Sequence, residues 1–170
     1  MTKPDHYPSD ISRVETRPLA VAIGACVAFI VLGTLTGGDQ TAVEWYAELE
    51  RPTFLPPTLL VLIMAALYYL IMGAVLYRAQ VHVPAGQARK LAVALTVLVM
   101  AVNAGWNAVF MNLQVLVAGV VGMAVFVGLL LWLALIFFRT DRTSFWVLLP
   151  YVVWSLYDLL WSVQLWTLNR

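Results

Sequence analysis

Residues 148–161 read LLPYVVWSLYDLLW, an apolar stretch that holds one carboxylate, Asp158. With the apolar residues that follow, the stretch reaches the length of about 20 residues that a helix needs to cross a bilayer. Three aromatic residues flank Asp158 at helical intervals of three and four and share its face: Tyr151, Trp154 and Trp161. A carboxylate facing lipid is costly, so we expect this face to point inward, toward other helices or a cavity.

The composition indicates a membrane protein. Of the 170 residues, 62% are hydrophobic and 11% are charged, whereas soluble domains average about 25% charged residues. We therefore predict an all-α integral membrane protein, a bundle of five transmembrane helices. The predicted spans are residues 18–37, 58–78, 91–111, 115–138 and 144–167. They belong to a single domain over residues 18–170, after a flexible cytoplasmic tail over residues 1–17.

The basic residues divide unequally between the two sides of this bundle. The side of the amino terminus collects Lys3, Arg13, Arg17, Arg78, Arg89, Lys90, Arg139 and Arg142. The other side has Arg51 and Arg170 beside an acidic first loop, in which residues 43–49 predict a short amphipathic helix. Because cytoplasmic loops carry the excess of Lys and Arg, we expect a cytoplasmic amino terminus, with the first loop and the carboxyl terminus outside. A bacterial cell membrane is the expected location.

Several function classes are disfavoured by the residues. A formal net charge of +1 gives no electrostatic basis for binding nucleic acid. The single cysteine, Cys26, cannot form an internal disulfide, and His6 and His82 have no second histidine or cysteine nearby, so we expect no metal site. No phosphate-binding loop or nucleophile elbow occurs, and we assign no catalytic residues.

The spans hold further polar and aromatic residues. One stripe in the third span comprises Asn103, Trp106, Asn107 and Phe110. Its amides suit either hydrogen bonds between helices or the polar edge of a ligand. Asp158 likewise has two interpretations. It contacts a cationic or N–H-bearing ligand or transfers a proton, or it is a structural carboxyl bonded to Asn103, Asn107 or a tyrosine. Tyr68 and Tyr69 are adjacent, so we expect only one to face inward.

Six segments resemble the signature of one membrane family. They read WYAELERP at 45–52, PP at 56–57, LYYLIMG at 67–73, NAGWNAVF at 103–110, LPYVVW at 149–154 and WTLN at 166–169. In their order and spacing they are similar to the TspO/MBR family, the tryptophan-rich sensory proteins related to the mitochondrial translocator protein. The likeness covers essentially the whole chain from Pro18 onward.

The resemblance implies a five-helix bundle, often dimeric, with a pocket that opens toward the first loop. The family binds porphyrins such as protoporphyrin IX and haem, sterols and some drug-like aromatics. We expect no required cofactor, with porphyrin or haem as the ligand and membrane lipids around the protein. Small residues four apart in the third span, Ala101 with Gly105 and Ala104 with Ala108, offer a seam for a homodimer.

The chain also departs from the family pattern, as a divergent member. Tryptophans usual in the family are absent at Thr53 or Phe54, Leu59 and Ala65. The tryptophan aligned with Ala65 is linked to light-dependent porphyrin breakdown, so its absence argues against that chemistry here. Tyr157 and Asp158 replace small residues, which should narrow or re-polarise the pocket. No basic residue follows Tyr151 in the pattern proposed for cholesterol contact, so that motif gives sterol binding no support.

Together, the residues and the resemblance predict a membrane receptor or carrier for hydrophobic ring ligands, above all porphyrins, with a role in tetrapyrrole traffic or stress regulation. The alternatives are a membrane-embedded enzyme that acts on a porphyrin or lipid through Asp158, and a sterol or lipid transporter. An enzyme needs a second titratable group beside Asp158, and a transporter more often shows internal repeats, so binding is preferred. The predicted ligand-binding residues are Trp45, Phe54, Tyr68, Asn103, Trp106, Asn107, Phe110, Tyr151, Trp154 and Asp158.

Overall fold

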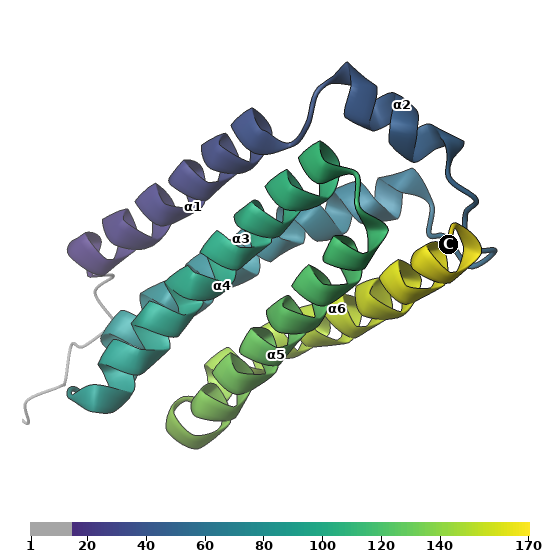
Figure 1. Cartoon of the computed structure of the whole chain (residues 1–170). Coiled ribbons are helices and arrows are strands. Elements are labelled where there is room, and N and C mark those ends of the chain that lie inside the picture. The colour runs from purple at the N-terminus through teal and green to yellow at the C-terminus, as the bar shows by residue number, and fades with distance from the viewer. Residues whose placement is uncertain (1–14) are drawn as a thin grey trace, which may run out of the picture.

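The computed structural model describes residues 15–170, which form six helices (Figure 1). They are α1 (Thr16–Thr36), α2 (Gln40–Glu48), α3 (Thr58–Val81), α4 (Gln87–Leu113), α5 (Leu116–Thr140) and α6 (Arg142–Leu168). Most of the predicted amino-terminal tail lies outside the described residues. Its last two residues, Thr16 and Arg17, belong to α1, because Pro18 is well tolerated in the first turn of a helix.

Five of these six helices are long and apolar enough to cross a membrane, which confirms the predicted fold class. Several run two to four residues beyond the predicted spans. Hydropathy detects only the apolar part of a helix, whereas backbone hydrogen bonds continue into its polar flanks. The short helix α2 begins at Gln40 rather than at residue 43, because the Asp39 carboxylate accepts hydrogen bonds from the Thr41 and Ala42 amides and caps it.

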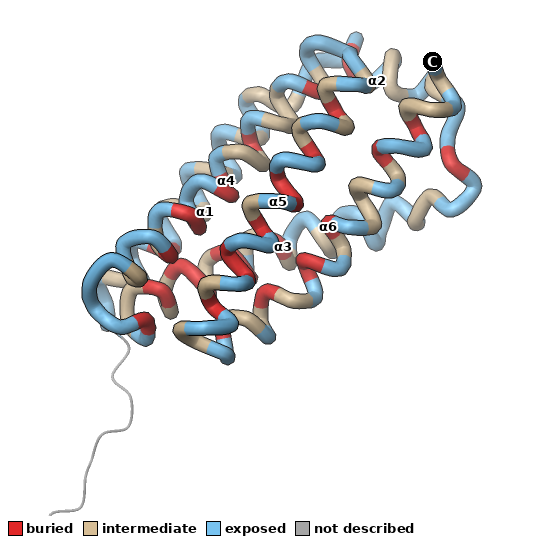
Figure 2. The backbone as a smooth tube through the Cα atoms, turned by 60° about the horizontal axis from the view of Figure 1, so that its bottom comes forward, coloured by how far each residue is buried: buried red, intermediate tan, exposed pale blue. Residues whose placement is uncertain are grey.

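Four of the long helices form a closed ring. α3 packs against α4, α4 against α5, α5 against α6, and α6 against α3. α1 packs outside this ring against α3 and α4, and most of its side chains are exposed, as lipid contact requires (Figure 2). α2 crosses one end of the bundle, close to the carboxyl terminus (Figure 1). We call this the α2 end, and we call the opposite end, where α3 turns into α4 and α5 into α6, the turn end.

The packed core lies toward the turn end. Its fully buried side chains include Met72, Val75, Leu76, Val99, Leu130, Leu133, Phe137 and Leu148. Lipid tails are as apolar as these side chains, so burial away from lipid does not drive the helices together. Close packing of the side chains drives the association instead, and it holds the four ring helices in fixed positions.

One ion pair ties α3 to the turn between α5 and α6. The Arg78 guanidinium donates to both carboxylate oxygens of Asp141, at 2.9 and 3.0 Å. The Ser144 hydroxyl donates to the same carboxylate at 2.6 Å. Burial by itself raises the pKa of Asp141, but the hydrogen bonds and charge of Arg78 and the bond from Ser144 outweigh it and hold the pKa below its usual value.

We expect Asp141→Asn to destabilise the protein by about 1.5–3 kcal/mol near pH 7, because Arg78 loses a charged hydrogen-bond acceptor. Folding lowers the pKa of Asp141, so its contribution is present above the ordinary value of 3.8 and is lost as the pH falls through the folded-state value. Thermal unfolding in detergent should therefore show a wild-type advantage that shrinks in acid. Arg139→Gln removes an exposed charge near the same turn as the control. Equal losses for the two variants would contradict this role.

Candidate functional site

A cavity of about 490 Å³ lies within the bundle toward the α2 end. Its walls come from α2, the loop that follows α2, α3, α4 and α6, whereas α5 contributes no lining residue. Aromatic side chains dominate the lining: Tyr46, Tyr68, Tyr69, Trp106, Phe110, Tyr151, Trp154, Tyr157 and Trp161. A cavity of this size, mostly apolar with a few polar groups, is typical of a site for a small organic molecule.

The wall from α6 is the stripe around Asp158. Tyr151, Trp154, Asp158 and Trp161 all line the cavity, as their helical spacing predicts. The hydrogen bonds among the described residues include none from Asn103, Asn107 or a tyrosine to the Asp158 carboxylate. The Asp158 main-chain carbonyl accepts a bond of 2.8 Å from the Ser162 hydroxyl, within the same helix. The structure therefore does not show the hydrogen bonds to Asn103, Asn107 or a tyrosine that a purely structural role for Asp158 would use.

The wall from α4 carries the second stripe. Asn103, Trp106, Asn107 and Phe110 line the cavity together. The Trp106 and Phe110 rings are stacked, with centroids 5.5 Å apart and planes 9° from parallel. The Asn107 amide donates to the Asn103 carbonyl at 3.0 Å, one turn back on its own helix, rather than across to another helix. The stripe thus presents two stacked rings and two amides to the interior.

Two glycines of α5 make room for these rings. A Cβ added at Gly122 would lie 2.2 Å from Cδ1 of Trp106, and one added at Gly119 would lie 2.6 Å from Cδ2 of Phe110. The close approach also lets the Trp106 indole N–H donate to the Gly119 carbonyl at 2.8 Å. α5 therefore holds Trp106 in place from behind, although it does not reach the cavity.

Gly122→Ala should force Trp106 out of its position and break its bond to Gly119. We expect a loss of about 1–3 kcal/mol in stability, the usual cost of overpacking a close contact. Thermal unfolding and the near-ultraviolet circular dichroism of the tryptophans would measure it. Gly128→Ala on the same helix is the matched control, because an added Cβ there meets no atom within 4 Å. A loss of equal size at both positions would show that Trp106 does not depend on the gap.

The wall from α3 holds two tyrosines. Tyr68 is 3% exposed, and its ring centroid lies 4.8 Å from that of Tyr151. Tyr69 also lines the cavity while its hydroxyl donates toward the Phe29 carbonyl of α1 at 3.5 Å. The expectation that only one of the pair faces inward is therefore wrong. Both residues line the cavity, and their rings pack edge to face against each other with centroids 5.0 Å apart.

Two polar atoms at the cavity have no hydrogen-bond partner within the described part of the chain. They are the Tyr68 hydroxyl and the Trp161 indole N–H, and both are buried. An unpaired buried polar atom costs about 1–3 kcal/mol. Neither atom is accessible to a water-sized molecule, so the packing of the surrounding side chains leaves both atoms without a partner.

The mouth of the cavity is formed by α2 and the loop over residues 49–57. Tyr46 and the exposed Arg51 line it, and the Arg51 guanidinium carbon lies 5.5 Å from the centroid of the Tyr46 ring. Burial raises the pKa of Tyr46, and the nearby charge of Arg51 lowers it in part. We did not predict Arg51 or Tyr46 as site residues, because nothing in a single charge or ring on a loop indicates which way it faces.

The loop over residues 49–57 is tied to α6. The Glu50 amide donates to the Asn169 side-chain oxygen at 2.9 Å, and the Asn169 side-chain amide donates back to the Glu50 carbonyl at 2.9 Å. Further along, the Tyr157 hydroxyl donates to the Phe54 carbonyl. These bonds hold the loop across the cavity. The bond to Phe54 gives Tyr157 a structural role.

Asn169→Ala should loosen this loop by removing both bonds to Glu50. Each such bond contributes roughly 0.5–1.5 kcal/mol, so we expect amide hydrogen exchange in residues 49–57 to become about tenfold faster. Exchange measured by mass spectrometry would test this. Gln164→Ala, at an exposed position of the same helix, is the control. Unchanged exchange in the Asn169 variant would show that the loop is held by other contacts.

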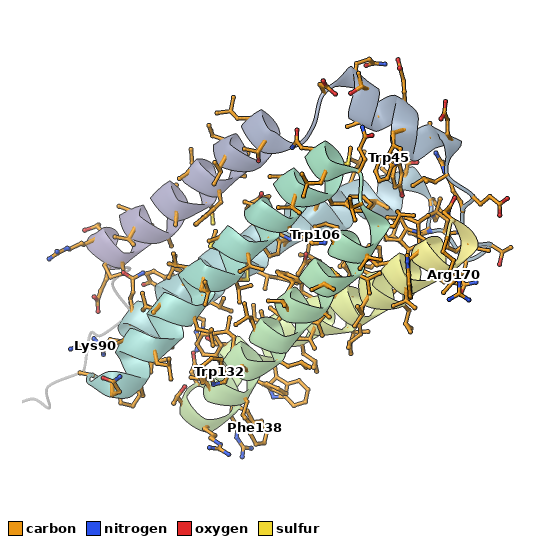
Figure 3. All side chains as sticks on the ribbon, in the orientation of Figure 1. Trp45, Lys90, Trp106, Trp132, Phe138 and Arg170 are labelled. Carbon is orange, nitrogen blue, oxygen red and sulfur yellow. The ribbon has the colours of Figure 1, made fainter. Side chains whose placement is uncertain are left out.

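Trp45 and Phe54, two of the ten predicted ligand-binding residues, lie outside the lining of this cavity. Trp45 precedes Tyr46 on α2, and consecutive helical residues point about 100° apart, so the two rings leave α2 in different directions and Tyr46 is the one that lines the cavity. Trp45 instead packs edge to face on Phe110, with centroids 5.5 Å apart, and lies beneath α2 (Figure 3). Phe54 is 44% exposed and packs against Tyr157. The other eight lie together around the cavity.

Formal charge at the cavity comes from two side chains. They are Arg51 at the mouth and Asp158 within the span of α6. Among the described residues, no group of three histidine, cysteine, aspartate or glutamate side chains lies close enough to hold a metal ion. The arrangement offers flat aromatic surfaces and a few polar atoms, which suits recognition of a ring-shaped molecule.

Comparison with known proteins places these features in a family. The TspO/MBR family model matches residues 22–167. Protein CrtK of Rhodobacter capsulatus is 27% identical over 139 residues, which cover 79% of this chain and 84% of CrtK. Tryptophan-rich protein TspO of Chlorobaculum tepidum is 26% identical over 136 residues, 80% of this chain and 85% of that protein. Tryptophan-rich protein TspO of Archaeoglobus fulgidus is 30% identical over 131 residues, which cover 76% of this chain and 83% of that protein.

Proposed function

Because this chain belongs to the TspO/MBR family and has five helices that can span a membrane, we propose that it is a membrane receptor or carrier for porphyrins, protoporphyrin IX and haem among them. The ligand occupies the cavity between α3, α4 and α6. Its binding serves tetrapyrrole traffic or stress regulation.

The observation that carries this proposal is the aromatic lining of the cavity. Nine aromatic side chains surround about 490 Å³ of space. A flat macrocycle gains from offset stacking and edge contacts with such rings, at about 0.5–1.5 kcal/mol for each well-placed pair beyond the area it buries. Trp154 and Tyr157, with centroids 5.4 Å apart, provide neighbouring surfaces on α6 for one edge of the ring system.

The polar groups match the other features of a porphyrin. Its carboxylates suit the guanidinium of Arg51, which lies at the water-accessible mouth. The inner N–H groups of protoporphyrin IX, which haem lacks, suit a hydrogen-bond acceptor at one face of the ring, and Asp158 supplies one. The ring would then lie across the cavity, with its charged edge toward the loop over residues 49–57.

We also propose an orientation in the membrane and a dimer interface. The described part of the turn end carries Arg17, Arg78, Arg89, Lys90, Arg139 and Arg142. Figure 3 shows Lys90 at that end and Arg170 at the α2 end. The positive-inside rule then directs the turn end to the cytoplasm and the mouth of the cavity outside.

The proposed homodimer interface is on α4. Ala101 and Gly105 are exposed and can contact a second copy, whereas Ala104 is buried in the bundle. The pair Ala101 and Gly105 therefore forms the proposed interface.

Titration of the purified protein with protoporphyrin IX, followed by quenching of tryptophan fluorescence, tests the proposed function. We expect saturable binding that Trp154→Leu weakens about three- to tenfold, the loss that corresponds to one aromatic contact. Trp146→Leu is the matched control, because Trp146 lies at the other end of the same helix and is 63% exposed. Absence of saturable binding to the folded wild type would refute the porphyrin proposal, and equal weakening by both variants would place the site elsewhere.

A further inference from the structure

Asp158 lies in the span of α6 without a counter-charge from the described residues. The other charged lining residue is Arg51, whose guanidinium lies against the Tyr46 ring at the mouth. The salt bridge found among the described residues, Arg78 with Asp141, is at the turn end. The Asp158 carboxylate therefore faces the cavity without a cationic side chain to balance it.

The depth of Asp158 makes this arrangement costly. Asp158 precedes the end of α6 at Leu168 by ten residues, which corresponds to about 15 Å of helix. That distance places it well inside the apolar part of the bundle. Charges in such places are normally paired with an opposite charge, because an isolated one loses its hydration without compensation. Since the described residues supply no opposite charge, the carboxyl group either takes up a proton or is paired by a cationic occupant of the cavity.

The surroundings of Asp158 fit a positively charged occupant. Trp154 lies one turn before it and Trp161 one turn after it on the same face, and Tyr157 is its neighbour. The faces of indole and phenol rings attract cations through their quadrupoles, most strongly where water is excluded. A carboxylate among aromatic rings is the combination that binds organic ammonium groups, with the rings contacting both the charge and the apolar body of the molecule.

We propose that the cavity selects ring-shaped ligands that carry a protonated amine, with the ammonium group at Asp158 and the ring system between the aromatic walls. This inference rests on the proposed function in one respect, that the cavity binds flat ring molecules. The new element of the inference is that the ligand carries a positive charge. Tyr68 and Tyr151 line the inner end of the cavity, Asp158 lies between them and the mouth, and Arg51 stands at the mouth. The nitrogen of an amine therefore binds beside Asp158, and any acidic group of the ligand remains near Arg51.

Three probes of one ring size and different charge test the proposal: 1-pyrenemethylammonium, 1-pyrenemethanol and 1-pyrenecarboxylate. Each is titrated into the purified full-length protein in detergent near neutral pH, and energy transfer from tryptophan to pyrene reports binding, with empty micelles as the blank. We expect the wild type to bind the ammonium at least about tenfold more tightly than the alcohol, and more tightly than the carboxylate, whose charge can be paired only at Arg51. Asp158→Asn should reduce affinity for the ammonium about tenfold and leave that for the alcohol unchanged.

Glu48→Gln is the matched control, because it removes an exposed carboxylate from α2 at the same end of the bundle. It should leave the ranking of the probes as in the wild type. Equal affinity of the wild type for the ammonium and the alcohol overturns the proposal without any variant. If protoporphyrin IX binds and the ammonium has no advantage, the charge preference is wrong and the proposed function stands. If neither protoporphyrin IX nor any pyrene binds, both fail.

Discussion

Hydrocarbon provides no hydrogen-bond partner, and every polar group within the membrane-spanning part of this chain must be satisfied by the protein itself. The backbone meets this requirement by forming helices. Hydroxyl groups in the spans meet it by bonding to carbonyls of their own helix, as Thr96 does to Ala92 and Ser155 to Val152. Within the described residues, the buried side-chain atoms left unpaired are the Tyr68 hydroxyl and the Trp161 indole N–H, and both lie at the cavity. The two unpaired atoms thus belong to two residues of the cavity wall, one on α3 and one on α6.

Side chains fill the interior of the bundle at the turn end, whereas the α2 end contains the cavity. Toward the turn end, aliphatic side chains and Phe137 fill the space between the ring helices. Toward the α2 end, Trp106 and Phe110 pack back against the glycines of α5 instead of filling the interior. Large rings that are held at the walls leave space between them. The cavity therefore results from where the rings are anchored, and α2 with its loop covers the open end.

The sequence predicted the two stripes well, because helical spacing is a local property. Tyr151, Trp154 and Asp158 on α6 line the cavity as their intervals of three and four require, and the stripe of α4 faces them. Spacing could not distinguish Trp45 from Tyr46, since the short α2 offers too few turns to define its inner face. It also could not indicate that Gly119 and Gly122 support the rings of α4, because that contact joins two helices.

Apolar runs and their lengths were enough to determine that the chain forms five membrane helices, because hydrocarbon thickness sets the length of a span and the need for internal hydrogen bonds sets its conformation. Helical spacing also determined which residues share a face. Only the tertiary structure decided that two such faces meet around a cavity, that Arg51 stands at its mouth, and that none of the described residues forms an ion pair with Asp158 there. Those outcomes depend on how helices far apart in the chain pack, and lipid favours no one arrangement of apolar helices, so shape complementarity between side chains makes the choice.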